Sequence, residues 1–402
     1  MILSALQIRG IQKHSTDGVR ENRLKVRFVQ SMRMLMIAWV SCAALAWGDS
    51  ANAQEQQGIA LGQFRLLPTL GLSYGHDDNV ALTNEEQIES YFYVISPGIR
   101  LELPTDRSVT SLTWAMEVGR YADSSIDDYD DQELRLDWIY DPNTRHNFTA
   151  FAGWRFGHDR RGERFRQGDD ALLPVEPDEW EQKSLGGSWT YGAAGARGRL
   201  QIDLAATDLR YTNNEEFTYY RDYRQEQLGA SFFWRIFPKS RLGVGAEWAT
   251  FDYYHQDDQV SSLDSEASYY YVGFEWDLSA RTTGRVDYGY HEKTFDDPLR
   301  EGYDGDFWRA SVDWMPRTYS IFTLAASRNT NETDGWGNYI LRDDVSLTWN
   351  HSWNTHLSTS AEIGIGNEQH RPDPREDDFF WWGLSARWQF NQYLQLGAGW
   401  QY

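Results

Sequence analysis

The last two dozen residues of the chain alternate between apolar and polar side chains with a period of two. The apolar positions are Phe380, Trp382, Leu384, Ala386, Trp388, Phe390, Leu394, Leu396, Ala398, Trp400 and Tyr402. The residues between them are mostly small or polar, and a short turn at 391–392 separates the two runs. A period of two places alternate side chains on opposite faces of a β-strand. One face could lie in lipid and the other in water, as in a transmembrane β-barrel.

The whole-chain averages describe an acidic, polar protein of 402 residues with a formal net charge of −22 and a mean hydropathy of −0.66. A barrel strand gives such averages because a polar residue follows each lipid-facing one. The 19 Trp and 23 Tyr residues suit the aromatic girdles at membrane interfaces. A soluble β-sandwich or propeller is the alternative, but no blade-length repeat supports it. We predict an all-β fold, a transmembrane antiparallel up-and-down outer-membrane β-barrel of about 16–18 strands.

The N-terminal region has the features of a secretory signal. Residues 34–47 are an apolar segment preceded by basic residues, and Ala51-Asn52-Ala53 is a small-x-small cleavage site. We predict a signal peptide over 1–53, with Met32 or Met34 as alternative starts, a periplasmic segment over 54–65 and the barrel over 66–402. The single cysteine, Cys42, lies in the signal, so the mature chain has no thiol chemistry. A lipoprotein reading of Cys42 is the weaker alternative.

Short and long connections alternate between the expected strands. The short ones are at 104–107, 141–145, 193–197, 237–240, 279–282, 315–318, 352–355 and 391–392. The longer polar stretches include 76–89, 122–129, 158–178, 255–264, 295–304, 330–338 and 368–376. Outer-membrane barrels have short periplasmic turns and long extracellular loops. This arrangement gives about 17 strands, and a barrel of more than about 12 strands is wide enough for an aqueous pore unless loops plug it.

The strands can be sorted by face. Lipid-facing sets are Leu112/Trp114/Met116/Val118, Leu134/Leu136/Trp138, Phe148/Ala150/Ala152/Trp154/Phe156, Leu228/Ala230/Phe232/Trp234/Ile236, Leu242/Val244/Ala246/Trp248 and Val345/Leu347/Trp349. The opposite faces carry charges that would be costly in lipid, and we predict that these residues line the lumen. They are Glu117, Arg135, Asp137, Arg155, Asp203, Arg235, Glu247, Glu275, Asp287, Arg309, Asp313, Glu362 and Arg387. Inward glycines (Gly153, Gly243, Gly245 and Gly383) are expected to leave lumen volume.

Acidic pairs gather in the long loops or at the strand ends beside them. The pairs are Asp77-Asp78, Asp127-Asp128, Asp130-Asp131, Asp169-Asp170, Asp257-Asp258, Asp296-Asp297, Asp343-Asp344 and Asp377-Asp378. Basic residues mark many short turns, namely Arg107, Arg145, Lys239, Arg281 and Arg317. We therefore expect a negative extracellular rim. Either the aspartates only keep the loops soluble, or they bind divalent cations that bridge to lipopolysaccharide or an anionic polymer.

Catalysis is not expected. The candidate pairs His76-Asp77 and His158-Asp159, and His255 with Asp257-Asp258, lie at outer strand ends. Adjacent residues on a strand face opposite ways, so such pairs are poor dyads. His351-Ser352 lies at a periplasmic turn. We predict no catalytic residue, no cofactor and no metal site, and the charge of −22 disfavours nucleic acid as a partner.

The segment 58–100 resembles the putative β-barrel porin 2 family of Gram-negative outer-membrane proteins. The matching features are Gly-x-x-Leu-Gly-x-Phe at 58–64, a proline before the first strand, Asp78-Asn79-Val80, Pro97-Gly98, Trp314-x-Pro316 with Thr318, and Arg328. The resemblance covers about 58–402, and none of its motifs is catalytic. Because members are often associated with exopolysaccharide or capsule export loci, it implies a passive conduit for such a polymer. The alternatives are a general diffusion porin for small solutes and a structural or adhesin barrel with a plugged lumen. The implied location is the cell outer membrane, and the implied partners are its lipid and lipopolysaccharide, the barrel assembly machinery and polysaccharide export components.

The strand count conflicts with the even number usual for bacterial single-chain barrels. If the first strand rises from the periplasm at Leu66, then 393–402 also rises and Tyr402 lies outside. We expect a missing final strand and an intact form of about 18 strands. A strand hidden in 54–65 or in a long loop, or a 16-stranded barrel ending at Phe390, would also restore an even count.

Overall fold

The computed structural model describes residues 2–8, 58–83, 86–167, 171–173, 175–193, 195–255, 261–279, 281–335, 337–391 and 393–402. The predicted apolar signal segment, its cleavage site and Cys42 lie outside these residues, and so do Asp169-Asp170 and Asp257-Asp258. The assignment of 1–53 as a signal peptide therefore stays a prediction.

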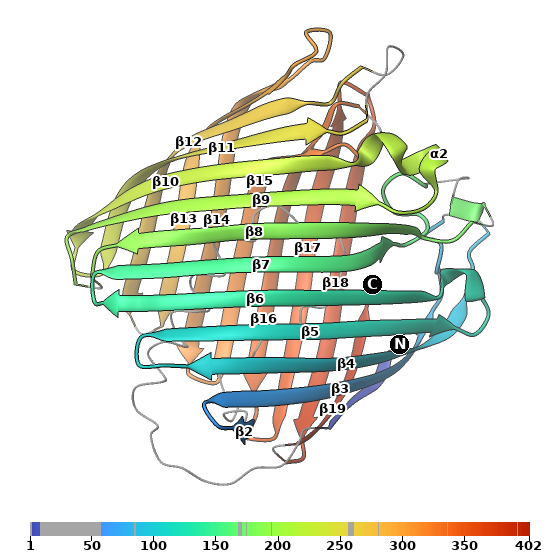
Figure 1. The fold of residues 1–402 in the computed structure, drawn as a ribbon, viewed down its shortest axis with the longest axis horizontal. Helices are drawn as coiled ribbons and strands as arrows, with labels where there is room; N and C mark the ends of the chain where they lie inside the picture. The colour runs from blue at the N-terminus through green and yellow to red at the C-terminus, as the bar shows by residue number, and fades with distance from the viewer. Residues whose placement is uncertain are drawn as a thin grey trace.

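The described chain is a single antiparallel sheet in which each long strand pairs with the next one along the sequence. The long strands are β3 (Phe64–Asp77), β4 (Ser90–Pro104), β5 (Ser108–Tyr121), β6 (Tyr129–Asn143), β7 (His146–Asp159), β8 (Asp178–Tyr191), β9 (Gly198–Tyr211), β10 (Tyr223–Phe237), β11 (Ser240–Tyr253), β12 (Ser265–Ser279), β13 (Thr282–Phe295), β14 (Tyr303–Arg317), β15 (Ser320–Glu332), β16 (Tyr339–Ser352), β17 (Leu357–Arg371), β18 (Glu376–Gln389) and β19 (Leu394–Gln401). With the short β2 (Ile59–Leu61), the strands β2 to β19 number eighteen among the described residues. The predicted all-β, up-and-down architecture is confirmed (Figure 1).

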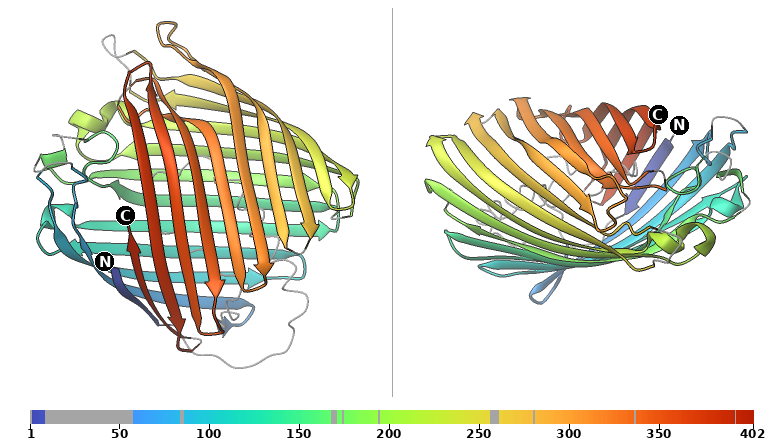
Figure 2. Two further views of the ribbon diagram at one scale, coloured as in Figure 1. Left: turned by 180° about the vertical axis from the view of Figure 1, so that it is seen from behind. Right: turned by 90° about the horizontal axis from the view of Figure 1, so that it is seen from above.

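The outward face of the sheet is apolar, as the alternation predicts. Leu228 and Trp234 on β10 and Val244 on β11 have exposed side chains, whereas Phe233, between two outward residues of β10, is fully buried. A sheet that leaves large apolar side chains exposed on its convex face suits a lipid environment. Figure 2 shows the strands curving into one layer, with the two ends of the described chain beside each other.

The predicted short turns all connect neighbouring strands, and the long loops gather at the other end (Figure 1). The β9–β10 connection, 212–222, is also long, and it contains α2 (Glu215–Thr218) and η3 (Tyr219–Arg221). A further turn of 3₁₀ helix, η1 (Ser125–Asp127), lies between β5 and β6. No helix in the described ranges is both long and apolar enough to cross a membrane.

The sheet is not closed directly between its first and last long strands. Strand β1 (Ile2–Ile8) lies between them, antiparallel to β19 over several positions, and it meets β3 only where Leu3 faces Tyr74. Strand β1 falls inside the predicted signal peptide. Strand β19 pairs with β18 from Gln389 to Gly383, so the alternative of a barrel ending at Phe390 is wrong.

The first strand begins earlier than predicted. Strand β3 starts at Phe64 and contains Pro68, which the sequence places before the strand. Pro68 pairs with Ile99 of β4, and on its other side β2 reaches only to Leu66 among the described residues. Proline is tolerated where one side of a strand needs no donor.

The expectation that inward glycines leave lumen volume is wrong for Gly243 and Gly245. A Cβ atom on Gly243 would lie 2.5 Å from the Phe233 ring, and one on Gly245 would lie 2.3 Å from the Tyr271 ring. The rings of neighbouring strands therefore lie flat on these glycines and fill the space. At Gly383, by contrast, the nearest atom would be 3.8 Å away.

Candidate functional site

The thirteen predicted lumen residues all lie on the strand face opposite the exposed apolar side chains. The structure brings four of them, Glu247, Glu275, Asp287 and Arg309, into one network and pairs Arg135 with Asp137. The other seven have separate surroundings. Whether this face lines a water-filled passage stays a prediction.

The network is a row of alternating charges across β9 to β14, which we call the charge ladder. Arg199 lies 2.5 Å from Glu275, and Arg285 lies 3.5 Å from the same carboxylate. Arg285 also donates to Asp287 at 2.8 Å. Arg309 donates to Asp287 and Glu247, each at 2.6 Å. Because Asp287 is fully buried, its charge depends on the two guanidinium groups beside it.

Aromatic rings support the charge ladder. The guanidinium carbons of Arg199 and Arg285 lie 5.2 and 4.8 Å from the centre of the buried Phe233 ring. Arg309 lies 4.9 Å from the ring centre of Tyr271. Stacking on a ring holds a guanidinium plane in one orientation. The ladder is therefore a fixed array of charges on the inner wall.

The Arg135–Asp137 pair, at 2.9 Å, lies beside the Phe151 ring, 4.5 Å from the guanidinium carbon. The remaining predicted residues are spread around the barrel. Four carboxylates accept hydrogen bonds from uncharged side chains: Glu117 from Tyr129 (2.6 Å), Asp203 from Gln201 (2.9 Å), Asp313 from Thr323 (2.7 Å) and Glu362 from Trp381 (2.9 Å). The guanidinium group of Arg155 lies over the Trp180 ring. In the strand register, Arg235 is opposite Arg241 and Arg387 is opposite Gly397.

The described residues of the β7–β8 connection, 160–167, 171–173 and 175–177, reach across the long-loop end of the barrel, which the sequence predicts to be extracellular, and we call this connection the mouth loop. Arg161 is buried and donates to Asp127 of the β5–β6 connection at 2.7 Å. Arg160 donates to Asp77 at the end of β3 at 2.7 Å. Burial lowers the pKa of Arg160, but its interactions with the Tyr121 phenol and the Asp77 carboxylate outweigh burial and raise the pKa above its ordinary value. These bonds hold the loop against the β3–β6 side of the mouth.

The tip of the mouth loop reaches the opposite side of the barrel. Gln167 donates to Asp334 at 2.9 Å and accepts a bond from Arg375 at 2.5 Å. Asp334 lies between β15 and β16, eight strands further along the sheet than the loop itself. Arg221, from the β9–β10 connection, lies 4.7 Å from the Phe165 ring. The loop therefore spans the mouth and is fixed on several sides.

The extracellular end of the β15–β16 hairpin also leans inward. Strand β15 pairs with β14 no further than Arg328. Beyond it, Thr330 bonds to the buried His291 at 2.7 Å, and Glu332 accepts bonds from Lys293 (2.5 Å) and Tyr253 (2.8 Å). The hairpin tip thus crosses the inner face of β14. The hairpin and the mouth loop therefore both lie on the inner side of the sheet at this end of the barrel.

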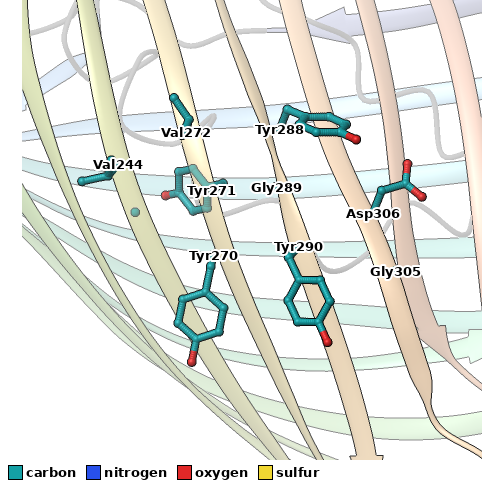
Figure 3. A pocket seen from close by; sticks show the side chains of 10 residues that line it. Val244, Tyr270, Tyr271, Val272, Tyr288, Gly289, Tyr290, Gly305 and Asp306 are labelled. Carbon is teal, nitrogen blue, oxygen red and sulfur yellow. The ribbon is translucent and has the colours of Figure 1, made fainter.

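A groove of about 700 Å³ lies on the other, outward face. Figure 3 shows Tyr270, Tyr288 and Tyr290 projecting from β12 and β13 around it. The exposed Val244 and Val272 form part of its lining. Because these residues belong to the lipid-facing set, the groove is a feature of the outer wall and not of the lumen.

A family model described as "Putative beta-barrel porin 2" matches residues 52–402. The chain belongs to this family. The match covers the whole barrel, so the resemblance noted in the sequence is confirmed, and the protein is a porin-like barrel of the cell outer membrane. No curated protein matches the chain.

Several solved structures are similar to this chain. The FrpB iron transporter from Neisseria meningitidis (F5-1 variant) is 9% identical with a TM-score of 0.47, covering 85% of this chain and 63% of that one. The unliganded ferric citrate transporter FecA is 11% identical with a TM-score of 0.47, covering 82% and 57%. The porin spans about six-tenths of their length. A structure titled "Bacterial polysaccharide outer membrane secretin" is 9% identical with a TM-score of 0.35, covering 100% and 98%.

In the described part of the chain, two histidines of the candidate pairs contact other acidic residues. His158 bonds to Asp131 at 2.8 Å, while Asp159 accepts a bond from Trp180 at 3.0 Å. His255 lies 3.5 Å from Asp222. Across the described ranges no group of three or more acidic, histidine or cysteine side chains could hold a metal ion.

Several acidic pairs of the porin hold arginines. Asp127 binds Arg161, and Asp343 accepts a bond from Arg328 at 2.7 Å. Arg328 also contacts Asp306 at 3.1 Å on the outward face. These aspartates fix loops and strand ends, and such a role needs no cation.

The sequence did not predict two sets of residues that form the network and hold the mouth loop. Arg199 and Arg285 complete the charge ladder, and the period of two could have identified both, because each shares its strand face with a predicted lumen residue. The arginines of the mouth loop were also missed. Their signal was the basic run 160–166 within otherwise acidic connections.

Proposed function

We propose that this outer-membrane barrel is a passive conduit for an exopolysaccharide or capsular polysaccharide. The observation that carries the proposal is the inner wall, on which aromatic rings lie flat beside charged groups. Trp381 covers Gly364 and donates to Glu362, and Arg342 lies 4.7 Å from the ring centre of Phe379. Sugar rings have apolar faces and hydroxyl edges, which suit aromatic surfaces and nearby charged groups.

The number of strands supports a passage of this kind. The eighteen described strands β2 to β19 exceed the roughly 12 above which a barrel leaves space for an aqueous channel. The charges of the ladder are paired with one another, so a neutral or charged chain can slide past them without breaking one strong site. No catalytic step is part of the proposal. Outer-membrane lipid, lipopolysaccharide, the barrel assembly machinery and polysaccharide export components are the proposed partners.

The test is deletion of the gene followed by measurement of secreted polymer, with the polymer held in the periplasm measured in the same cells. We expect loss of secretion and periplasmic accumulation, both reversed by the wild-type gene. A variant lacking 161–176 of the mouth loop should also restore secretion, because the loop is not part of the wall. Unchanged secretion in the deletion strain would contradict the proposal.

The second candidate is a structural barrel with a plugged lumen, and the mouth loop favours it. Planar bilayer recordings of the variant lacking 161–176 separate the two, since added polymer does not change the current of a structural barrel from which the loop has been removed. A conduit gives current when residues 161–176 are removed, and its current falls when polymer is added. A general diffusion porin would conduct small ions in the wild-type form and would leave polymer secretion unchanged on deletion.

A further inference from the structure

His370 lies between two carboxylates at the long-loop end of the barrel. Its Nε2 atom is hydrogen-bonded to Asp377 at 3.1 Å, and its Nδ1 atom lies 3.2 Å from a carboxylate oxygen of Asp334. The Nδ1 contact is not aligned as a hydrogen bond, so it acts through charge. The His370 side chain is fully buried. Its two ring nitrogen atoms therefore both face negative groups, away from water.

This arrangement of His370 requires a proton. A neutral imidazole ring has one N–H group, whereas the cationic ring has two. In the neutral form the ring would donate to one carboxylate and turn a lone pair toward the other, which is unfavourable in a buried site. Both contacts are favourable together only when the ring carries its second proton.

The contacts of His370 join separate parts of the long-loop end. His370 lies near the end of β17, Asp377 lies on β18, and Asp334 lies in the β15–β16 connection. The tip of the mouth loop is attached at the same place, because Gln167 bonds to both Asp334 and Arg375. The protonated ring thus fastens the β15–β16 connection to β17 and β18, and the mouth loop is bonded to that connection.

Four further charged side chains lie around this cluster: Arg375 of the β17–β18 connection, Arg342 of β16, Glu368 of β17 and Arg221 of the β9–β10 connection. Arg375 lies 2.6 Å from Asp377 and 3.9 Å from Asp334. Arg342 and Glu368 are 2.6 Å apart and balance each other. Arginine keeps its charge at every pH at which proteins are folded. His370 is therefore the basic group here whose charge can change between about pH 5 and pH 8.

We propose that His370 is a pH-sensitive joint of the mouth. With its second proton it holds the β15–β16 connection and the tip of the mouth loop in place, and loss of that proton releases them. The attached state binds one proton more than the released state, so attachment is complete at low pH and is lost as the pH rises through the titration of the histidine. This inference does not depend on what passes through the barrel.

The test is the mobility of a nitroxide label on the mouth loop, recorded by electron paramagnetic resonance on the purified full-length protein in detergent. The label is attached at Leu173→Cys, because Leu173 is exposed and the predicted mature chain has no other cysteine. We expect an immobilised label at about pH 5 and a mobile fraction that grows toward about pH 9. For release of one proton, the ratio of attached to released loop falls by at most about tenfold per pH unit.

Two substitutions test the proton itself. His370→Gln removes the titrating ring, so the pH dependence should disappear and the label should be mobile throughout. Asp377→Asn replaces one carboxylate with an amide. A neutral ring can then donate to Asp334 and accept a bond from the amide, so the label should stay immobilised at high pH. Heat-modifiable migration on gels establishes that each variant is a folded barrel.

The matched control is His356→Gln. His356 is an exposed histidine at the short-turn end of the barrel, bonded to the Gln389 carbonyl at 2.8 Å, and its loss should leave the pH response unchanged. Equal mobility of the label at every pH would overturn the inference, as would an unchanged response in His370→Gln or in Asp377→Asn. A response lost in His356→Gln would place the titrating group elsewhere and would also reject the role of His370.

Discussion

The Asp287 carboxylate lies 2.6 Å from the Nε atom of Arg309 and is fully buried on the inner wall. Replacing Asp287 with Asn should leave the charges of Arg285 and Arg309 without their shared partner. Breaking a buried ion pair in this way costs about 3–5 kcal/mol. The measurement is the midpoint of guanidinium unfolding in detergent. Asp313→Asn is the control, because Asp313 is only half-buried, with a hydrogen bond from Thr323, and an equal loss in both variants would contradict the role of the ladder.

The ion pair between Arg161 and Asp127 fixes the mouth loop. Arg161→Ala should free the loop and increase its cleavage by trypsin at the remaining arginines, while the barrel keeps its heat-modifiable migration. The buried pair is worth several kcal/mol, whereas an exposed pair contributes about 0–1 kcal/mol. Arg120→Ala removes such an exposed pair with Asp130 and should not change trypsin cleavage. The role assigned to Arg161 is wrong if both variants are cut at the same rate.

The proposed export of polymer through the mouth would require the mouth loop to move away from Asp334, to which Gln167 is bonded. The variant Gln167→Cys/Asp334→Cys, treated with a short bis-maleimide, should secrete less polymer than the untreated variant. The predicted mature chain has no other cysteine, so the cross-link is specific. Asn367→Cys/Asp378→Cys is the control, because these residues already face each other across β17 and β18. Full secretion from the cross-linked Gln167→Cys/Asp334→Cys protein would show that polymer does not pass this way.

Gly364 is required because the Trp381 ring lies on it. A Cβ atom there would be 2.0 Å from the ring, so Gly364→Ala should displace Trp381 from the wall and cost about 1–3 kcal/mol through overpacking. Tryptophan fluorescence and the unfolding midpoint report the change. Gly383→Ala, where the nearest atom would be 3.8 Å away, should leave both unchanged. Similar shifts in the two variants would mean that lost backbone freedom, and not the ring, is responsible.

The assignment of faces can be tested on adjacent residues of β16. Ser346→Cys should react with a water-soluble maleimide in protein reconstituted into lipid vesicles, because Ser346 faces inward. Leu347→Cys should not react, because Leu347 has an exposed side chain on the lipid face. If Leu347→Cys reacts and Ser346→Cys does not, the lumen lies on the opposite face of the sheet from the one assigned.

The alternation from Leu112 to Trp400 was sufficient to predict the strands, their faces and the turns. This information is local, because neighbouring side chains of any strand point to opposite sides. The start of β3 was placed at Leu66 instead of Phe64, and Pro68 was placed before the strand although an edge position tolerates proline.

The rest of the site depends on which strands are neighbours. The Phe233 ring covers Gly243 because the register of β10 and β11 places the two residues side by side. The sequence of one strand does not indicate which residue of the next strand it will face. The bonds of Gln167 to Asp334 and Arg375 join residues far apart in sequence. The alternation of side chains carries no information about such loop contacts, so the sequence left a plugged lumen as one of several alternatives.

The position of Gln167 also sets the order in which the molecule assembles. Its partner Arg375 follows it by 208 residues, and contacts of such long range form late because the intervening chain must first be ordered. Strands β8 to β17 have to be in the sheet before the mouth loop can be anchored on its far side. Docking of the loop on its far side is therefore expected to be a late step of folding, which follows the pairing of these strands.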